Sequence, residues 1–525
     1  GLTYATNGQT GSDALSITVV DDGGTVGIAR TVTDSIDVNL NLITTSTNAN
    51  PGSVQWGNAA TWAHPGPDSG STNVIPTAAH HAYVIDGSGG MTIGDGGDYT
   101  VGAVSLGNAT TISNGSSLTV EQLIDFQFDA SFIGRGTITG YLQMNTNGEL
   151  YVDGTVDDDA GTMYLTDGIL GGTGSIAMSK FIFGASSSGT DDLTVQDLTI
   201  TVNDFGSNVS YSQGGGTKTF NNVDMTVEGD LRLSSGNENF ILAGGSEITV
   251  ASGGLLDLED ADGITVGTGG GKVTVLAGGT LDRSTNTGDT AIHAEVDLAG
   301  TLTVQAGKLE LAGGGSITNS ATVSSGATLE LSGSTAFAID DAFNLGGAGT
   351  TLLDAATVNV TGAFAVLGTH TLNIAAGTTV NVTDGSFSNA GTITGEGTLV
   401  IADGVPFTNT GIIDPAGTLT ITGDLDLGAS GGMTFDIAST SDFDAISADN
   451  LDLDGATNVL NLKFGAGASP GDSFDIVTYN DTDTDLSDVF ETVNVTGLAS
   501  NQAATLSYTA TGITVTITEA PTVSS

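Results

Sequence analysis

The feature that most constrains the fold is a series of four-residue segments in the second half of the chain, in which apolar and polar residues alternate. Alternation with a period of two predicts β-strands, and the Gly, Ala-Gly or Asp-Gly that closes most segments predicts turns. No stretch here sustains helical spacing, and the strands are shorter than the about five to six residues typical of a β-sandwich. The segments are 295–298, 301–304, 308–311, 328–331, 371–374, 398–401 and 418–421.

A longer repeat lies over this alternation. The motif Ser-Phe-Ser-Asn-Ala-Gly-Thr-Ile at 386–393 returns as Pro-Phe-Thr-Asn-Thr-Gly-Ile-Ile at 406–413, and a third copy occupies 316–323. A fixed period near 20 residues, built of several short strands, predicts the coils of a parallel β-helix, in which each coil buries its inward residues against the next. Between Met91 and about Ser430 there is room for roughly 17 coils of about 20 residues.

One polar residue recurs within the motif. Asn319, Asn389 and Asn409 fall at the same position of the three copies. We expect them to stack at the strand spacing, so that their amides bond along the ladder and to the turn backbone. This predicts a structural role for these residues, in preference to a ligand-binding one.

The charge of the chain restricts its partners. Nine Lys and Arg face 60 Asp and Glu, a net charge of −51, and aromatic residues make up 6%. Nucleic acid is excluded as a partner because its binding needs cations, and the sequence holds no apolar run of about 20 residues that would insert into a membrane. The charge fits solubility in a salty medium or a surface that collects divalent cations. With no Cys, disulfides and thiolate sites are excluded, which fits an exported, extracellular bacterial surface protein.

Residues 1–45 differ in pattern from the rest of the chain. Two alternating segments, 14–20 and 30–40, flank the turn Asp21-Asp22-Gly23-Gly24. The segment resembles the last strands of the cadherin-like repeats of large bacterial adhesins, and it is too short for a complete domain. Its missing strands would lie upstream, or it would complete a sheet of a neighbouring subunit. Asp21, Asp22 and Asp34 are the candidate calcium ligands, and a solvated turn is the alternative reading of the same residues.

Residues 46–100 hold both Trp residues, a Pro-rich loop and the sequence His-His-Ala-Tyr-Val-Ile-Asp at 80–86. This resembles the opening segment of many secreted bacterial β-helix proteins, where it implies a cap over the open end of the coils. His64, His80 and His81 are a further candidate metal set. Adjacent residues of a strand point to opposite faces, however, so His80 and His81 are poorly placed to share one ion.

The segment from about 423 to 518 is similar to the end of autotransporter-type secreted β-helix proteins. The resemblance rests on segments such as Gly-Met-Thr-Phe-Asp-Ile at 432–437 and Pro-Gly-Asp-Ser-Phe-Asp-Ile-Val at 470–477. It implies a C-terminal cap of longer, twisted strands. The chain starts and ends without a leader or targeting tail, so we expect a piece of a longer exported protein.

Catalytic and calcium motifs are weak in this sequence. The nine basic residues are scattered, so no cationic substrate cleft is predicted, and the Asp pairs lack the companions of polysaccharide-cleaving enzymes. The tandem glycine-aspartate repeat that binds calcium is missing, and 257–262 does not fit the spacing of an EF-hand loop. Apart from the three candidate aspartates near the N-terminus, calcium is therefore predicted as a cofactor from the net charge alone.

The sequence predicts an all-β chain: a right-handed parallel β-helix (a solenoid) with an N-terminal cap, a short β-sandwich-like lead and a C-terminal β cap. The expected domains are 1–45, 46–100, 101–430 and 431–525. The expected function is structural, as the rod of a bacterial cell-surface adhesin, filament or surface layer, with copies of itself or other surface proteins as partners. The alternatives are a β-helix carbohydrate-active enzyme and an adhesin that binds surface glycans.

Overall fold

The alternating segments are β-strands in the structure, a computed structural model of the chain. The structure describes residues 168–183, 192–202, 209–210, 216–233, 238–259, 263–428, 430–453, 457–479 and 489–520, and before residue 168 it describes the strands and Ile75. Residues 1–41, most of the predicted sandwich-like lead, lie outside this part. The described residues are all-β, as predicted, and none of them is helical.

The chain divides into two compact units, residues 1–155 and 156–525. In the first unit, parallel pairing builds two series of strands. One series is β1 (Leu42–Ser46), β3 (His80–Val84), β5 (Asp98–Leu106) and β7 (Ser117–Phe126), followed by β9 (Thr137–Thr139) and β10 (Leu142–Met144). The other is β2 (Val54–Gln55), β4 (Met91–Ile93), β6 (Thr110–Ile112), β8 (Ser131–Gly134) and β11 (Glu149–Val152). The domain boundaries at 45, 100 and 430 stay predictions.

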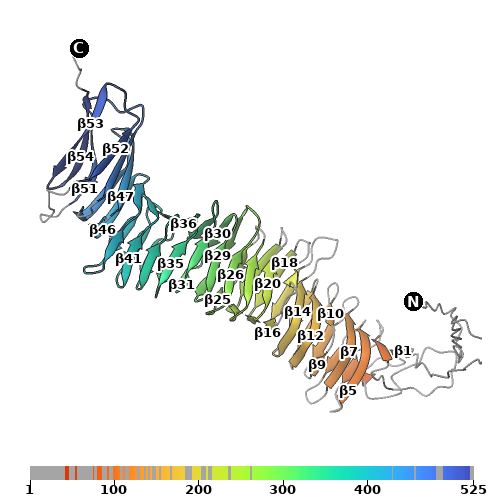
Figure 1. The fold of residues 1–525 in the computed structure, drawn as a ribbon. Coiled ribbons are helices and arrows are strands. Elements are labelled where there is room, and N and C mark those ends of the chain that lie inside the picture. Colours follow the sequence, from red (N-terminus) through yellow and green to blue (C-terminus); the bar gives the residue numbers. More distant parts are fainter. Residues whose placement is uncertain are drawn as a thin grey trace, which may run out of the picture. The chain divides into compact units, whose positions relative to one another are not determined.

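The second unit is a solenoid of about 11 coils, each coil contributing one strand to each of three parallel ladders (Figure 1). Its first strand is β12 (Thr155–Leu165), of which all but Thr155 belongs to this unit. Ladder 1 contains β14 (Ser175–Phe183), β16 (Thr199–Val202), β19 (Asp224–Val227), β22 (Ser246–Val250), β25 (Gly271–Val275), β28 (Glu295–Leu298), β31 (Gly315–Ile317), β34 (Phe337–Ile339), β37 (Thr357–Val360), β40 (Thr379–Val382), β43 (Thr398–Ile401) and β46 (Thr418–Asp426).

The other two ladders run beside it. Ladder 2 contains β17 (Val209–Ser210), β20 (Asp230–Leu233), β23 (Leu255–Leu258), β26 (Thr280–Arg283), β29 (Thr301–Val304), β32 (Ala321–Val323), β35 (Phe343–Gly346), β38 (Ala363–Val366), β41 (Ser386–Asn389) and β44 (Phe407–Asn409). Ladder 3 contains β13 (Gly168–Gly171), β15 (Leu193–Gln196), β18 (Gly216–Asn221), β21 (Glu238–Ala243), β24 (Ile264–Val266), β27 (Asp289–Ile292), β30 (Lys308–Leu311), β33 (Thr328–Leu331), β36 (Thr350–Leu353), β39 (Thr371–Ile374), β42 (Thr392–Gly395) and β45 (Ile412–Pro415).

The predicted period is confirmed by the contacts between coils. From residue 297 to 412, cross-coil side-chain hydrogen bonds join residues 19 to 23 positions apart. The glycine turns are confirmed as well. Gly278, Gly326 and Gly377 have φ angles of 86°, 81° and 85°, which residues with a Cβ rarely adopt. Each turn is closed by a backbone hydrogen bond, for example from Thr378 N–H to the Ala375 carbonyl.

The core of the solenoid consists of inward-facing columns, one residue from each coil. On ladder 3 one column is Leu309, Leu329, Thr351, Leu372, Ile393 and Ile413, all at most 1% exposed. On ladder 2 another is Phe343, Phe364, Phe387 and Phe407, whose ring centroids lie 5.6, 5.1 and 5.1 Å apart in sequence order. Because a side chain cannot bury itself within one coil, the stacking of coils creates this core.

The C-terminal cap is confirmed, with strands of up to eight residues. Ladder 3 continues from β45 through β47 (Gly432–Ser439) and β50 (Val459–Phe464) to β52 (Thr492–Thr496). Ladder 1 continues through β49 (Ala445–Asp452) and β51 (Ser473–Thr478), and it ends in the antiparallel strands β54 (Gly512–Glu519) and β53 (Gln502–Thr509). The short strand β48 (Asp442–Phe443) pairs antiparallel with β47.

Candidate functional site

Outward-facing side chains form columns along the coils, just as the inward ones do, because the register is parallel and in phase. In the coils between residues 230 and 332, three of these columns centre on a cation. Arg232 lies on β20 of ladder 2, Lys272 on β25 of ladder 1 and Lys308 on β30 of ladder 3. Each contacts carboxylates of a neighbouring coil, and Arg232 and Lys308 also contact one on their own strand. We refer to these three groups as the charged columns.

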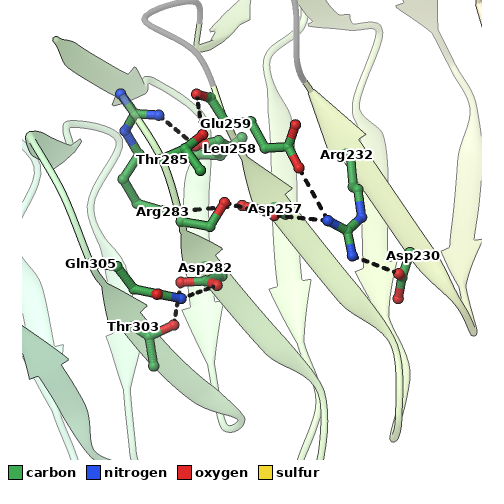
Figure 2. A network of polar contacts seen from close by, with 11 residues as sticks. Asp230, Arg232, Asp257, Leu258, Glu259, Asp282, Arg283, Thr285, Thr303 and Gln305 are labelled. Carbon is green, nitrogen blue, oxygen red and sulfur yellow. Dashed lines mark hydrogen bonds and ion pairs between the residues drawn. The ribbon is translucent and has the colours of Figure 1, made fainter. Parts of the chain in front are cut away.

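Arg232 joins two coils of ladder 2 (Figure 2). Its Nη2 lies 3.0 Å from Oδ2 of Asp230, on the same strand. Its Nη1 lies 3.1 Å from Oε1 of Glu259 and 3.6 Å from Oδ2 of Asp257, both one coil further on. The hydrogen bond to Asp230 is the main cause that raises the pKa of Arg232. One guanidinium thus holds three carboxylates of two coils in place.

The column continues with two buried aspartates. Asp257 is 2% exposed and Asp282, its register partner on β26, is 9% exposed. Asp257 accepts hydrogen bonds from Ser284 Oγ at 2.9 Å and from Ser284 N–H at 3.3 Å. Asp282 accepts from Gln305 Nε2 at 2.7 Å and from the hydroxyl of Thr303, one coil further on (Figure 2). Burial raises the pKa of Asp257 to about 6.

Arg283 belongs to the interior. It is fully buried and pairs in register with Val304, so it occupies a position that elsewhere in the column is apolar. Its guanidinium donates to the carbonyl of Leu258 at 2.6 Å (Figure 2) and to that of Gly288 at 3.1 Å. These carbonyls belong to the previous coil and to the corner loop after β26. The side chain therefore ties the backbone of the corner to the coil before it.

Lys272 and Lys308 repeat the arrangement on the other two ladders. Lys272 lies in register between Glu247 and Glu295 and forms ion pairs with Glu295, at 3.6 Å, and with Asp297. The hydrogen bond with Asp297 is the main cause that raises the pKa of Lys272. Lys308 Nζ lies 2.9 Å from Glu330 and 3.2 Å from Glu310, which are register partners on adjacent coils.

The Lys308 column gives a test of what the charges contribute. Replacing Lys308 by Met is expected to destabilise the coils by about 1–2 kcal/mol, because Glu310 and Glu330 then face each other as unneutralised like charges. We expect the loss to shrink as salt is added, since salt screens the repulsion. Urea denaturation at low and high salt measures both effects.

The matched control is Lys463→Met. Lys463 forms an ion pair with Asp436 at 3.3 Å, but its side chain is 50% exposed and that of Asp436 is 63% exposed. An exposed pair of this kind is worth about 0.2–1 kcal/mol. An equal loss in both variants at low salt would show that the Lys308 column adds nothing beyond an ordinary surface pair.

A second polar group is enclosed by the coils. His370 is fully buried at a corner before β39, and its Nε2 lies 2.9 Å from Oγ1 of Thr351, the hydroxyl within the ladder 3 column. Burial lowers the pKa of His370 from 6.5 to about 4. The ring is therefore neutral at pH 7, and acid must charge it inside the core.

The pH dependence is set by the direction of that shift. The folded pKa of His370 lies below the unfolded one, so its contribution to stability is present above pH 6.5 and is lost as pH falls through about 4. Between pH 7 and about 4.5 the wild type should lose about 2 kcal/mol more than His370→Gln, at 1.36 kcal/mol per pKa unit. The folded pKa of Asp257 is raised, so Asp257 contributes more stability as the pH falls, opposite to His370. The effect of His370 is therefore measured as the difference between the wild type and the variant, in which Asp257 is unchanged. Equal losses in the two proteins would show that His370 does not titrate in the core.

The structure does not test the predicted metal ligands. Asp21, Asp22 and Asp34 lie outside the described residues, as does His64, and His80 and His81 lie on β3, whose pairing alone is described for them. Within the described residues, no three His, Asp or Glu side chains are grouped so that they could hold a metal ion. Of the acids from 257 to 262, Asp257 and Glu259 are held by Arg232. Calcium remains a prediction.

The charged columns were missed from the sequence, where the basic residues looked scattered. Their only sequence signal is a base and an acid separated by one coil, 22 residues for Lys308 and Glu330 and 27 for Arg232 and Glu259. The spacing varies with the corner loops, so counting along the chain does not reveal it. In the described part, the carboxylates of these columns bind the side chains of cations, hydroxyls and amides. Many of these partners belong to a neighbouring coil, so the contacts join one coil to the next.

Comparisons with other proteins add little to this geometry. Neither protein families nor curated proteins give a match to the sequence. Solved structures with similarity include the crystal structure of the Haemophilus influenzae Hap adhesin, at 10% identity and a TM-score of 0.23. The similarity covers 88% of this chain and 66% of that chain, slightly less than two thirds of it. The class of the protein, a parallel β-solenoid, therefore rests on its own strand registers.

The described part of the chain contains no helix with the length and apolar character needed to cross a bilayer.

Proposed function

We propose that this chain is a structural, non-catalytic shaft of an extracellular, adhesin-like surface protein. The observation that carries the proposal is the continuity of the solenoid from residue 263 to 428, where the three ladders run without interruption over apolar columns. A stack of this kind transmits force through many parallel hydrogen bonds, and each coil is held by both of its neighbours.

The outer surface supports the same role. The charged columns use their side chains to join one coil to the next, as Lys308 does with Glu330 and Arg232 with Glu259. Such contacts stabilise the stack, and the large excess of acid keeps it soluble. A net charge of −51 also suits a protein that works outside the cell among dissolved cations.

Neither alternative function is favoured by a described residue. A carbohydrate-active enzyme needs accessible carboxylates in a groove, whereas Asp257 and Asp282 are buried in hydrogen bonds. A glycan-binding surface needs exposed aromatic rings, whereas the large exposed apolar residues in the described part are Val and Leu. A receptor or glycan partner therefore stays a prediction.

Electron microscopy of the purified chain in calcium, and then in chelator, tests the proposal. Rods that keep their form in chelator support a shaft whose coils are held by the described protein contacts. Filaments or sheets that dissolve in chelator support a self-assembling surface layer cemented by calcium. Globular particles, with no rods in calcium or in chelator, would refute the proposal.

The cellular location needs its own test. Antibodies raised against residues 263–428 should label intact producing cells as strongly as permeabilised ones. Labelling that requires permeabilisation would contradict an extracellular role.

A further inference from the structure

The last strand of ladder 3 is unusual in its exposure. All five residues of β52 are exposed, and its one ladder partner in the described part is β50. Val493 and Val495 pair in register with Leu460 and Leu462, which are fully buried, yet the two valines are 39% and 41% exposed. The core column of ladder 3 therefore ends in an uncovered apolar surface.

The free edge of β52 carries defined hydrogen-bonding groups. Thr492 N–H donates to the carbonyl of Asn458, directly before β50. Because the backbone groups of successive strand residues point to alternate sides, those of Asn494 also face β50, and those of Val493 and Val495 face the open edge. Natural edge strands are usually protected by charges, proline or a covering segment, and residues 492–496 contain no charged residue and no proline.

The sequence of the strand reads the same in both directions. It reads Thr-Val-Asn-Val-Thr, a palindrome centred on Asn494. In antiparallel pairing with a second copy, a two-fold axis through Asn494 sets Val493 against Val495 of the second copy and Thr492 against Thr496. These valines are also the residues whose backbone groups face the edge, so both Val pairs would exchange backbone hydrogen bonds, about four in all.

Asn494 also suits this axis. Its Nδ2 donates to Oδ1 of Asn461 at 2.9 Å, and Asn461 in turn donates to Thr434 Oγ1 at 3.2 Å. Among the described residues, no donor reaches the Oδ1 of Asn494, the last amide of this row. Next to the strand, Glu491 would face Gly497 of the second copy, so no like charges are opposed despite the net charge of −51.

We propose that β52 is a self-association edge, through which two copies of this chain join in an antiparallel, two-fold dimer centred on Asn494. The interface continues the ladder 3 sheet from one copy into the other and covers Val493 and Val495. An isologous contact of this kind closes after two copies. The inference rests on the strand edge and is independent of the shaft role.

A single introduced cysteine tests the axis. Asn494 faces itself across a non-hydrogen-bonded pair, where Cα atoms lie about 4.5 Å apart, within the range of a disulfide. The native chain has no Cys, so N494C should give a covalent dimer on mild oxidation. The matched control is N461C, one strand further in on the same face, which should remain monomeric. Equal cross-linking of the two variants would overturn the proposal.

Removal of an edge donor tests the pairing. V495P deletes an N–H that faces the open edge and leaves the N–H groups that bond to β50, which is the setting in which strands tolerate proline. By sedimentation equilibrium the full-length wild type should dimerise, more strongly as salt screens the net charge, and V495P should dimerise at least tenfold more weakly. V266K, at another exposed valine (42%), should match the wild type. Open-ended growth with protein concentration, or undiminished association of V495P, would overturn the proposal.

Discussion

Phe364→Ala is expected to lower the free energy of unfolding by about 3–5 kcal/mol. Phe364 is 1% exposed, and its ring lies between those of Phe343 and Phe387, at centroid distances of 5.6 and 5.1 Å. The substitution removes a ring from the middle of a stack, and the cavity cannot close without shifting strands that pair on both sides. Urea denaturation measures the loss.

The matched control is Leu367→Ala, in the corner directly after the same strand. Leu367 is 45% exposed, so its truncation should cost less than about 0.5 kcal/mol. The aromatic contacts add about 0.5–1.5 kcal/mol per pair to the burial term, and Phe364→Leu should therefore recover part of the loss. A loss below that of Leu367→Ala would show that the aromatic column does not stabilise the solenoid.

Asn389→Ala is expected to cost about 2–4 kcal/mol, because it leaves more than one buried polar group unpaired. Asn389 is 1% exposed, and its Nδ2 donates to Oδ1 of Asn409 at 2.6 Å and to the carbonyl of Ile412 at 3.2 Å. Its Oδ1 accepts from Gly391 N–H, which closes the corner into β42. Urea denaturation measures the stability, and hydrogen exchange at Gly391 reports whether the corner opens.

Asn359→Ala provides the comparison. Asn359 accepts a similar amide hydrogen bond from Asn381, at 3.1 Å, but on the outer face of ladder 1, where water replaces a lost partner. Its removal should cost about 0.5–1.5 kcal/mol. If the two variants lose the same stability, the buried amides are not what secures the corner between ladders 2 and 3.

The asparagines also show how far the sequence predicts the structure. Stacking of Asn389 on Asn409 is confirmed, including the bonds to the turn backbone. The inclusion of Asn319 is wrong. It comes after β31 of ladder 1, whereas the other two end strands of ladder 2, and it is bonded to the carbonyl of Ala299 and to Ser320 N–H. The three motifs look alike because each corner of a coil needs a similar turn. The motif therefore predicts a corner, but it does not distinguish the corner after ladder 1 from the corner after ladder 2.

The strands and the core were predictable, because alternation and turn glycines are local signals. The charged columns were not, because they depend on the register between coils. Corner loops of different length change the number of residues that separate two register partners along the chain. Asp289 pairs with Lys308, whereas Ile264 pairs with Ile292, which lies further along the sequence from its partner. For the same reason the buried position of Arg283 cannot be counted from the sequence. The antiparallel end formed by β51, β54 and β53 depends on long-range pairing as well.

A shaft in which each coil is held by its neighbours should yield to force one coil at a time. Single-molecule stretching of the full chain, tethered at its two ends, tests this most directly. We expect a series of regular unfolding steps, each releasing about 20 residues, or roughly 7 nm of chain at 3.3–3.6 Å per residue. One unfolding event that releases the whole region from 263 to 428 at once, or extension without resistance, would contradict a shaft built of successive coils.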